Sequence, residues 1–432
     1  MLSPNQASLG VAYTGRPGAG KSTALRQLLK HFAELGCIIC WCCIKPDEAD
    51  IAASVLPDAV RFRPGSHVFN PITYELNREG GSASNLASFH DDLNDVLNRS
   101  DSQKQEAFWK SGATDTLVYA IELARLVKDE PTYADAYNII TSSPQNLEVA
   151  VSEDFRSTAC GWFINMLGNR NPNLAKPFAD FFMQRLPASG EKARGAFVTQ
   201  SVSSFKHFVD GPMSKVVEGV STITPEQMLT HHTILDFDTL THGIGGLAFQ
   251  LMMSWLCMEA VLRRKGEFPY FVLVRDEYHQ LAHAERDIRT QAVGRSQKFI
   301  GVSAFQSIPV LEAAMSGGVE AQTQARALYG LHVNKFMMNS NCPTTNEANS
   351  MVIGQEKQMF FGGSPNPQQD LEWYDVLGVG AGPQVSFSQQ WHYRVPPTAF
   401  TSLRSGGPEN DWTVDAIFHD GNDYQQVSFY QR

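Results

Sequence analysis

The sequence lacks the features that would assign it at once to a simple class of protein. It has no excess of basic residues: charged residues make up 19% of the chain and the formal net charge is −10. This excludes a protein that coats nucleic acid with its whole surface, although a locally basic channel stays open. A hydrophobic share of 43% indicates a globular rather than a disordered chain.

Membrane and export signals are also absent. No apolar run approaches the roughly 18 to 20 residues that span a bilayer. The first ten residues, MLSPNQASLG, have neither the basic start nor the apolar centre of an export signal. We therefore expect a cytoplasmic protein with no direct membrane insertion, and recruitment to a membrane by a partner stays open.

Zinc and other metal motifs built on cysteine or histidine are missing too. Four of the seven cysteines lie within CIICWCC at 37–43, but a zinc knuckle needs a second ligand pair and a turn between its ligands. A buried strand with reduced thiols is favoured, and it implies a reducing cytosol. The remaining histidine candidates lack a metal-like arrangement and are interpreted as structural or surface residues: His231, His232, His279 and His283.

A glycine loop near the N-terminus carries the clearest functional signal. A short apolar run, Leu9 to Thr14, enters GRPGAGKS at 15–22, which fits G-x-x-x-x-G-K-[ST]. A helical pattern follows and stops at Gly36. The order strand, loop, helix is typical of a phosphate-binding loop, whereas a glycine turn that matches by chance would not need these flanks.

The residue types in the loop fit the binding of ATP with Mg²⁺. Gly15, Gly18 and Gly20 are expected to adopt φ values that other residues resist, so that the backbone curls and its N–H groups point at phosphate oxygens. The helix adds its positive end. Lys21 is expected to reach the β- and γ-phosphates, and the Ser22 hydroxyl to ligate Mg²⁺. The expected nucleotide-binding residues are Gly15, Arg16, Pro17, Gly18, Ala19, Gly20, Lys21, Ser22 and Thr23.

An acidic pair downstream supplies the second half of a hydrolytic site. The apolar run YFVLV at 270–274 leads to Asp276 and Glu277 at the edge where α/β sheets place their ligands. Asp276 is expected to hold the Mg²⁺ shell, and Glu277 to orient and deprotonate the attacking water. Such a pair is common by chance, so its position after a phosphate loop carries the interpretation.

Further catalytic candidates have simpler alternatives. Gln306 ends a strand-like run and is expected to contact the γ-phosphate or the water, or else to be an ordinary exposed glutamine. Arg295 is the candidate arginine finger for a neighbouring subunit, with Arg289 and Arg326 as rivals. Lys45 and Asp236 also lie at predicted strand ends, and both are expected to face the nucleotide or a subunit boundary. The simpler alternative is that they are a solvated loop charge and a cap.

The order of patterns predicts an α/β fold with a mostly parallel sheet, interrupted by an all-α insertion. The predicted strands lie at 9–14, 37–44, 232–237, 269–274, 299–304 and 331–338. Residues 1–85 form the first part of the ATPase domain, 86–218 the helical insertion and 219–432 the remainder, with a flexible joint at 79–85. The last part, 355–432, is expected to be a loop-rich lid or sheet extension ending in a hairpin near Gly421.

The ordered motifs GRPGAGKST, KPDEAD, EAFWKSGATDTLVYAIELA, TILDFD, VLVRDEYHQLA and GRSQKFIGVSAFQS give the chain a family resemblance. It resembles the coupling-protein ATPases of type IV secretion and conjugation, the TraG/TraD group, within the HerA/FtsK class of hexameric DNA pumps. The similarity covers nearly all of the chain. One departure is clear: transmembrane helices precede the phosphate loop in membrane-anchored members, and only fourteen residues precede Gly15 here.

The resemblance implies a RecA-like P-loop NTPase domain with Walker A at 15–23, Walker B at Asp276 and Glu277, a sensor at Gln306 and a trans-acting finger at Arg295. It implies a homo-oligomeric, hexameric ring that binds ATP between subunits and passes single- or double-stranded DNA through its pore. The leading hypothesis is therefore a soluble, ring-forming, ATP-driven DNA translocase that serves conjugation, a mobile element, defence or DNA processing.

Two other hypotheses belong to different classes. One is an ATP-driven recruitment switch that binds protein partners through the helical domain without translocating DNA. The other is a P-loop phosphotransferase for a small molecule, which the large helical insertion disfavours.

Overall fold

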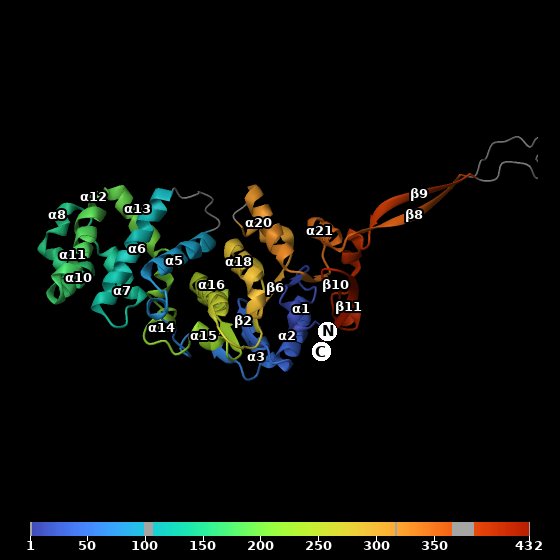
Figure 1. The fold of residues 1–432 in the computed structure, drawn as a ribbon, viewed down its shortest axis with the longest axis horizontal. Coiled ribbons are helices and arrows are strands. Elements are labelled where there is room, and N and C mark those ends of the chain that lie inside the picture. Colours follow the sequence, from blue (N-terminus) through green and yellow to red (C-terminus); the bar gives the residue numbers. More distant parts are fainter. Residues whose placement is uncertain (1, 99–106, 316–317, 365–383, 432) are drawn as a thin grey trace, which may run out of the picture.

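A nine-stranded sheet organises the computed structural model, which describes residues 2–98, 107–315, 318–364 and 384–431 (Figure 1). The strand order is β11-β10-β7-β1-β6-β5-β2-β4-β3. The strands are β1 Val11–Thr14, β2 Ile38–Cys43, β3 Val60–Phe62, β4 Thr233–Asp236, β5 Phe271–Arg275, β6 Phe299–Phe305, β7 Asn334–Met338, β10 Thr413–His419 and β11 Tyr424–Tyr430.

Seven of these strands run parallel, and only β10 and β11 add in antiparallel register. The predicted α/β class with a mostly parallel sheet is therefore confirmed. The predicted C-terminal hairpin is confirmed as β10 and β11, joined through Gly421, which has a φ of 96°. Because all parallel strands end at one edge, the residues that follow them are brought together there.

Both faces of the sheet are buried, as a parallel sheet requires. Along β2, Cys40 and Cys42 point into the core shared with the helix α16 (Thr239–Arg263), whereas Ile39 and Trp41 point into the core shared with the helix α2 (Lys21–Glu34). All seven cysteines are free thiols, and those of β2 are buried. The predicted strand of reduced thiols is confirmed.

Helices cover both faces of the sheet. α2 starts at the glycine loop, and its last residue, Glu34, lies two residues before Gly36, which has a φ of 76°. The helices that flank the sheet are α1 Pro4–Ala7, α2 Lys21–Glu34, α3 Glu48–Val55, α15 Pro225–Met228, α16 Thr239–Arg263, α17 Tyr278–Leu281, α18 Ala284–Gly294, α19 Ile308–Ala313, α20 Gly318–Leu331 and α21 Pro343–Ile353.

The helix α16 corrects the expectation that no apolar run approaches membrane-spanning length. By length and composition alone this 25-residue helix could cross a bilayer, with a mean hydropathy of 1.4 over its best window. However, 83% of that window is buried inside the protein. Its apolar surface is therefore used to hold the core together, and it is the one such helix among the described residues.

Every described element between β3 and β4, two strands that pair directly, is helical. Most of them, those between residues 107 and 202, lie at one end of the molecule (Figure 1). Besides α15, the α-helices are α4 Pro71–Asn77, α5 Ala83–Leu97, α6 Ala107–Val127, α7 Tyr133–Thr141, α8 Leu147–Ala150, α9 Glu153–Ser157, α10 Ala159–Arg170, α11 Pro172–Ala179, α12 Leu186–Ala188, α13 Glu191–Val202 and α14 Ser214–Val217. A π-helical stretch at Asp180–Arg185 and a short 3₁₀ turn at Lys206–Phe208 complete the set.

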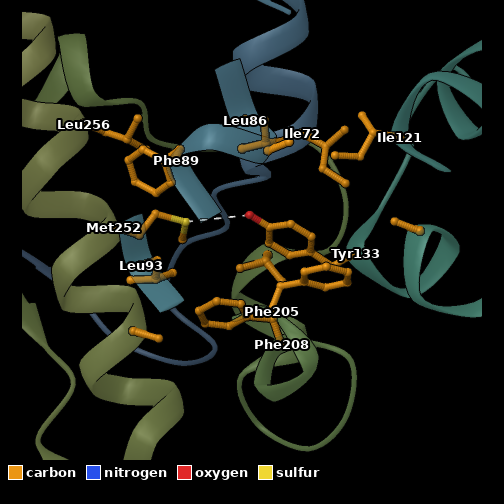
Figure 2. Close-up of a cluster of buried hydrophobic side chains, with 14 of the residues drawn as sticks. Ile72, Leu86, Phe89, Leu93, Ile121, Tyr133, Phe205, Phe208, Met252 and Leu256 are labelled. Atoms are coloured by element: carbon orange, nitrogen blue, oxygen red, sulfur yellow. Dashed lines mark hydrogen bonds between the residues drawn. The ribbon is translucent and has the colours of Figure 1, made fainter. Parts of the chain in front are cut away.

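These helices share one continuous apolar core with α16. Figure 2 shows Phe89 of α5 beside Leu256 of α16, and the Tyr133 hydroxyl of α7 directed at the Met252 sulfur of α16, 3.9 Å away. Burying side chains of this size stabilises the joint by roughly 1.5–3 kcal/mol each. The helical part is therefore packed firmly against the sheet domain.

Three local features differ from the sequence expectations. The joint at 79–85 is not a simple flexible link, because Ser82 caps α5 through a hydrogen bond from the Asn85 N–H. β3 falls in a segment without a predicted strand. Within the expected lid, β8 Gln355–Ser364 and β9 Gln384–Tyr393 pair as an antiparallel arm that projects from the body (Figure 1), and GGSPNPQQDLEWYD lies largely outside the described residues.

A buried histidine makes the stability of the helical part depend on pH. The ring of His90 bonds to the Tyr133 hydroxyl at 2.8 Å and to the Ser204 hydroxyl at 2.9 Å. Burial lowers the pKa of His90 to about 3, from an ordinary 6.5. Below pH 6.5 the unfolded chain therefore takes up a proton that the folded chain excludes, and stability falls as the pH drops toward 3.

We predict a loss of about 2 kcal/mol from His90 between pH 6.5 and pH 5. Urea unfolding at a series of pH values gives the free energy of unfolding at each pH. Over this range, that free energy should fall less steeply with decreasing pH for His90→Gln than for the wild type. His392, exposed on the arm, is the control position, and His392→Gln should leave the slope unchanged. Equal slopes for His90→Gln and the wild type would contradict the assignment.

Candidate functional site

The glycine loop lies between β1 and α2, and two of its glycines adopt left-handed backbone conformations. Gly18 has a φ of 76° and Gly20 a φ of 88°, values that cost other residues free energy. Gly15 does not, contrary to expectation. It is required for packing instead, because a Cβ there would lie 2.9 Å from the Met338 Cβ.

Neighbouring residues hold the loop in place. The Arg16 N–H donates to the Asn339 carbonyl at 2.9 Å, and the Arg16 Nε donates to the Asn339 side-chain oxygen at 2.6 Å. Pro17 is exposed, Ala19 is buried, and the Thr23 N–H donates to the Gly20 carbonyl at 3.0 Å. The loop is thereby tied to the end of β7 and to the first turn of α2.

Lys21 folds back across the loop. Its Nζ donates to the Gly15 carbonyl at 2.7 Å and to the Arg16 carbonyl at 3.1 Å. Burial lowers the pKa of Lys21, while the carboxylates of Asp276 and Glu277 act in the opposite direction. The ammonium is thus held by two backbone carbonyls of the loop itself.

The acidic pair lies beside this loop, as the order of the strands requires. Asp276 and Glu277 follow β5, and Glu277 adopts a left-handed φ of 55°, a strained conformation often found at functional sites. The Ser22 hydroxyl donates to the Asp276 Oδ2 at 3.4 Å. A hydroxyl and a carboxylate that converge in this way fit the oxygen ligands that Mg²⁺ prefers, so Ser22 and Asp276 could hold the ion.

A buried ion pair holds the turn that carries the acidic pair. The Arg275 guanidinium lies 2.5 Å from the Asp287 Oδ1, and the Tyr278 hydroxyl donates to the other oxygen at 2.9 Å. The side chains of Arg275 and Asp287 are each only 4% exposed. Breaking such a pair would leave an uncompensated buried charge, so this arrangement fixes the backbone next to Asp276.

Lys45 joins the site from β2 and was only partly foreseen. Its Nζ lies 2.9 Å from the Asp276 Oδ2 and 2.6 Å from the Glu277 Oε1. Burial alone would lower the pKa of Lys45, but the two carboxylates raise it above its usual value. Burial would likewise raise the pKa of Glu277, but Lys45 holds it below its usual value.

The loop that carries Lys45 is itself anchored. Both its N–H and that of Ile44 donate to the Glu48 Oε2, at 3.2 and 3.0 Å, and the Trp41 indole donates to the Glu48 Oε1 at 2.9 Å. Burial raises the pKa of Glu48 to about 7. The sequence could place Lys45 at a strand end, but only the sheet order puts β2 next to β5.

These groups surround one cavity of about 340 Å³ at the carboxyl edge of the sheet. Gln306, which follows β6, lines it as expected. Gln431, at the far end of the sequence, was not foreseen. The lining residues are Pro17, Gly18, Gly20, Lys21, Ser22, Thr23, Lys45, Glu277, Gln306 and Gln431.

A larger cavity of about 580 Å³ lies on the other side of Lys45. There Asp236 accepts a hydrogen bond from the Arg61 Nε at 2.7 Å, so Asp236 faces this second cavity rather than the phosphate loop. The second cavity has no glycine loop and is lined by charges of both signs. The smaller cavity is therefore the candidate for phosphate binding despite its size.

Arg295 is not brought to this cavity. It is exposed in a 3₁₀ turn just before β6, whereas Gln306 lies just after that strand. A seven-residue strand spans about 20 Å, so Arg295 lies near the opposite edge of the sheet from its own glycine loop. Arg289 lies on α18 and Arg326 on α20, and neither lines this cavity.

Comparisons with known proteins bear on the fold. No family model and no curated protein matches the chain. Its fold is similar to that of the bacterial conjugative coupling protein TrwBdeltaN70, with a TM-score of 0.68 at 13% identity over 99% of this chain and 86% of that one.

Two further structures are similar. The plasmid coupling protein TrwB in complex with ADP and Mg²⁺ gives a TM-score of 0.63 at 14% identity, over 99% of this chain and 87% of that one. VirB4 of Thermoanaerobacter pseudethanolicus gives 0.51 at 13% identity, over 98% and 88%. The predicted RecA-like P-loop NTPase fold, and the resemblance to coupling proteins at the level of the fold, are confirmed.

The two left-handed glycines make a quantitative prediction about the loop. A Cβ at Gly20 would lie 2.4 Å from the Val414 side chain, whereas a Cβ at Gly18 would meet nothing within 4 Å. Gly18→Ala should cost about 1–2 kcal/mol from the backbone alone, and Gly20→Ala about 1–3 kcal/mol more from overpacking.

Urea unfolding of both variants checks this prediction, and Val414→Ala provides the control background. Removing the Val414 methyl groups should bring the cost of Gly20→Ala down toward that of Gly18→Ala. If Gly20→Ala costs the same in both backgrounds, the close approach of Val414 is not the cause.

Proposed function

We propose that the chain is an ATPase of the coupling-protein type that assembles into a ring and couples ATP hydrolysis between subunits to the movement of DNA. The observation that carries the proposal is that the glycine loop, Ser22, Glu277 and Gln306 line one cavity, while the Ser22 hydroxyl contacts Asp276 beside it. The similar TrwB structure in complex with ADP and Mg²⁺ supports the same type of ligand.

Each residue has a role that its position supports. The loop from Gly15 to Thr23 binds the phosphates through its N–H groups, and Lys21 places its charge among them. Ser22 and Asp276 hold Mg²⁺, which when bound neutralises charge on the phosphates. Glu277 orients the attacking water and accepts its proton. Gln306 contacts the γ-phosphate or the water.

The exposed position of Arg295 supports a role between subunits. Because it lies across the sheet from its own glycine loop, it serves a neighbouring subunit as an arginine finger. This arrangement requires a closed ring, in which each subunit completes the site of the next. We propose a hexamer, with residues 86–218 as its helical domain and 1–85 and 219–432 as its ATPase domain.

DNA is the proposed substrate of the movement. The net charge of −10 leaves only local loops for sequence-independent phosphate contacts, and such contacts weaken as salt rises. The fold likeness to conjugative coupling proteins supports this class of substrate. The protein acts in the cytoplasm, with recruitment to a membrane left to a partner.

A second candidate function is a recruitment switch that binds protein partners through the helical domain. Large apolar side chains exposed there favour it: Leu147 is 53% exposed, Val151 75%, Trp162 43% and Leu174 47%. These residues lie on or next to the neighbouring helices α8, α10 and α11, and exposed apolar side chains are a feature of protein docking sites. This function predicts hydrolysis that is indifferent to DNA.

We predict that ATP hydrolysis is stimulated by single- or double-stranded DNA and that the stimulation fades between low and moderate salt. Steady-state assays of the wild type measure this directly. Lys21→Ala should abolish nucleotide binding, whereas Glu277→Gln should bind ATP normally and lose turnover by about 10²–10⁴-fold. DNA-insensitive turnover would favour the switch, and full activity in either variant would refute the site.

We predict that Arg295→Ala lowers turnover by about 10³-fold and leaves ATP binding intact. A mixture with Lys21→Ala subunits provides the sharper test, because about a quarter of random interfaces would then combine an intact loop with an intact arginine. Activity should reappear on mixing these two inactive proteins. Arg289→Ala and Arg326→Ala are matched controls and should keep their turnover when assayed alone. If one of them is inactive alone and regains activity when mixed with Lys21→Ala, that arginine is the finger instead of Arg295.

A further inference from the structure

The groups around the cavity come from both sides of β1. Lys45, Glu277 and Gln306 follow β2, β5 and β6, which lie on one side of β1 in the strand order. These are the groups suited to the terminal phosphate and the attacking water. The reacting end of a bound nucleotide therefore points toward that side of the sheet.

Gln431 reaches the same cavity from the other side of β1. It follows β11, and the strands on this side run in the order β11-β10-β7-β1. Thr413 pairs with Tyr430, so the start of β10 and the end of β11 lie together at the edge that carries the glycine loop. The Gln27 Nε2 of α2 donates to the Tyr430 carbonyl at 2.8 Å, and Figure 1 shows the C-terminal end beside α2.

The side chain of Gln431 is held in a defined orientation. Its Oε1 accepts a hydrogen bond from the Gly407 N–H at 2.8 Å, and the backbone N–H of Gln431 donates to the Trp412 carbonyl at 2.9 Å. A Cβ on Gly406 would lie 2.3 Å from the Gln431 amide, so glycine is needed for this close approach. With Oε1 fixed, the Nε2 donor is directed away from Gly407.

The turn that orients Gln431 is strained. Asp411 and Trp412 are consecutive residues with left-handed φ values of 51° and 56°, which residues other than glycine rarely adopt. The Trp412 N–H donates to the Gly407 carbonyl at 2.8 Å and closes the turn. Strained backbone of this kind clusters at ligand sites, because the surrounding structure holds it there.

From this geometry we propose that Gln431 binds the nucleoside end of the nucleotide, with its Nε2 donating to an acceptor on the base or the ribose. The inference rests on the proposed function, since it takes the orientation of the phosphates from the acidic pair. A neutral amide donor on the side of β1 away from that pair suits nitrogen and oxygen acceptors of a nucleoside. It distinguishes ATP from a bare polyphosphate.

Calorimetric titration of the full chain with ATP and with inorganic tripolyphosphate tests this inference. Gln431→Ala should weaken ATP binding by about three- to tenfold, the value of one hydrogen bond, and leave tripolyphosphate binding within twofold. Gln426→Ala, an exposed glutamine in the middle of the same strand, is the matched control and should change neither affinity. Ribose 5-triphosphate locates the contact. If Gln431→Ala weakens the binding of this ligand, the contact is on the ribose, and if its binding is unchanged, the contact is on the base.

The outcomes separate this inference from the proposed function. Equal weakening of ATP and tripolyphosphate by Gln431→Ala, or no effect on either, would overturn the nucleoside contact while the phosphate site stands. Failure of the wild-type protein to bind both ligands would overturn the phosphate site and the nucleoside contact with it.

Discussion

Two neighbouring carboxylates at the carboxyl edge of the sheet impose the main constraint on this structure. The side chains of Asp276 and Glu277 are only 3% and 11% exposed, so their charges are shielded from most of the water that would stabilise them. Lys45 lies within 2.9 Å of both groups, and Lys21 adds a second positive charge nearby. Charge compensation here requires the ends of β2 and β5 to lie together and the start of α2, which follows β1, to lie close to them.

The rest of the fold keeps these members in place. β5 is buried on both faces, and the Arg275–Asp287 pair behind it fixes the turn into Asp276. On the neighbouring strand β2, alternate side chains enter the two cores on either side of the sheet. One of these cores continues through α16 into the helical part, so the helical part and the sheet are packed against each other through one shared core.

The sequence was sufficient for the features that local chemistry determines. GRPGAGKST specifies the loop, the apolar runs specify β2, β5 and β6, and Asp420-Gly421 marks the turn between β10 and β11. The arm was missed because QEKQMF at the start of β8 has too few apolar residues for a strand pattern. Lys45 and Gln431 could not be placed fully, because their neighbours in space come from strands hundreds of residues away and adjacency depends on the sheet order. The paired glycines at 406 and 407 were the available signal for a close approach near Gln431.

We propose that the glycine loop and the acidic pair at the end of β5 form one site for a nucleotide with its Mg²⁺. The most direct measurement is ATP affinity with and without Mg²⁺ for the wild type, Ser22→Ala and Asp276→Asn. Mg²⁺ is expected to strengthen ATP binding to the wild type, and both substitutions are expected to remove this gain while binding without Mg²⁺ persists. An equal gain from Mg²⁺ in the wild type and in Asp276→Asn would show that Asp276 does not hold the ion.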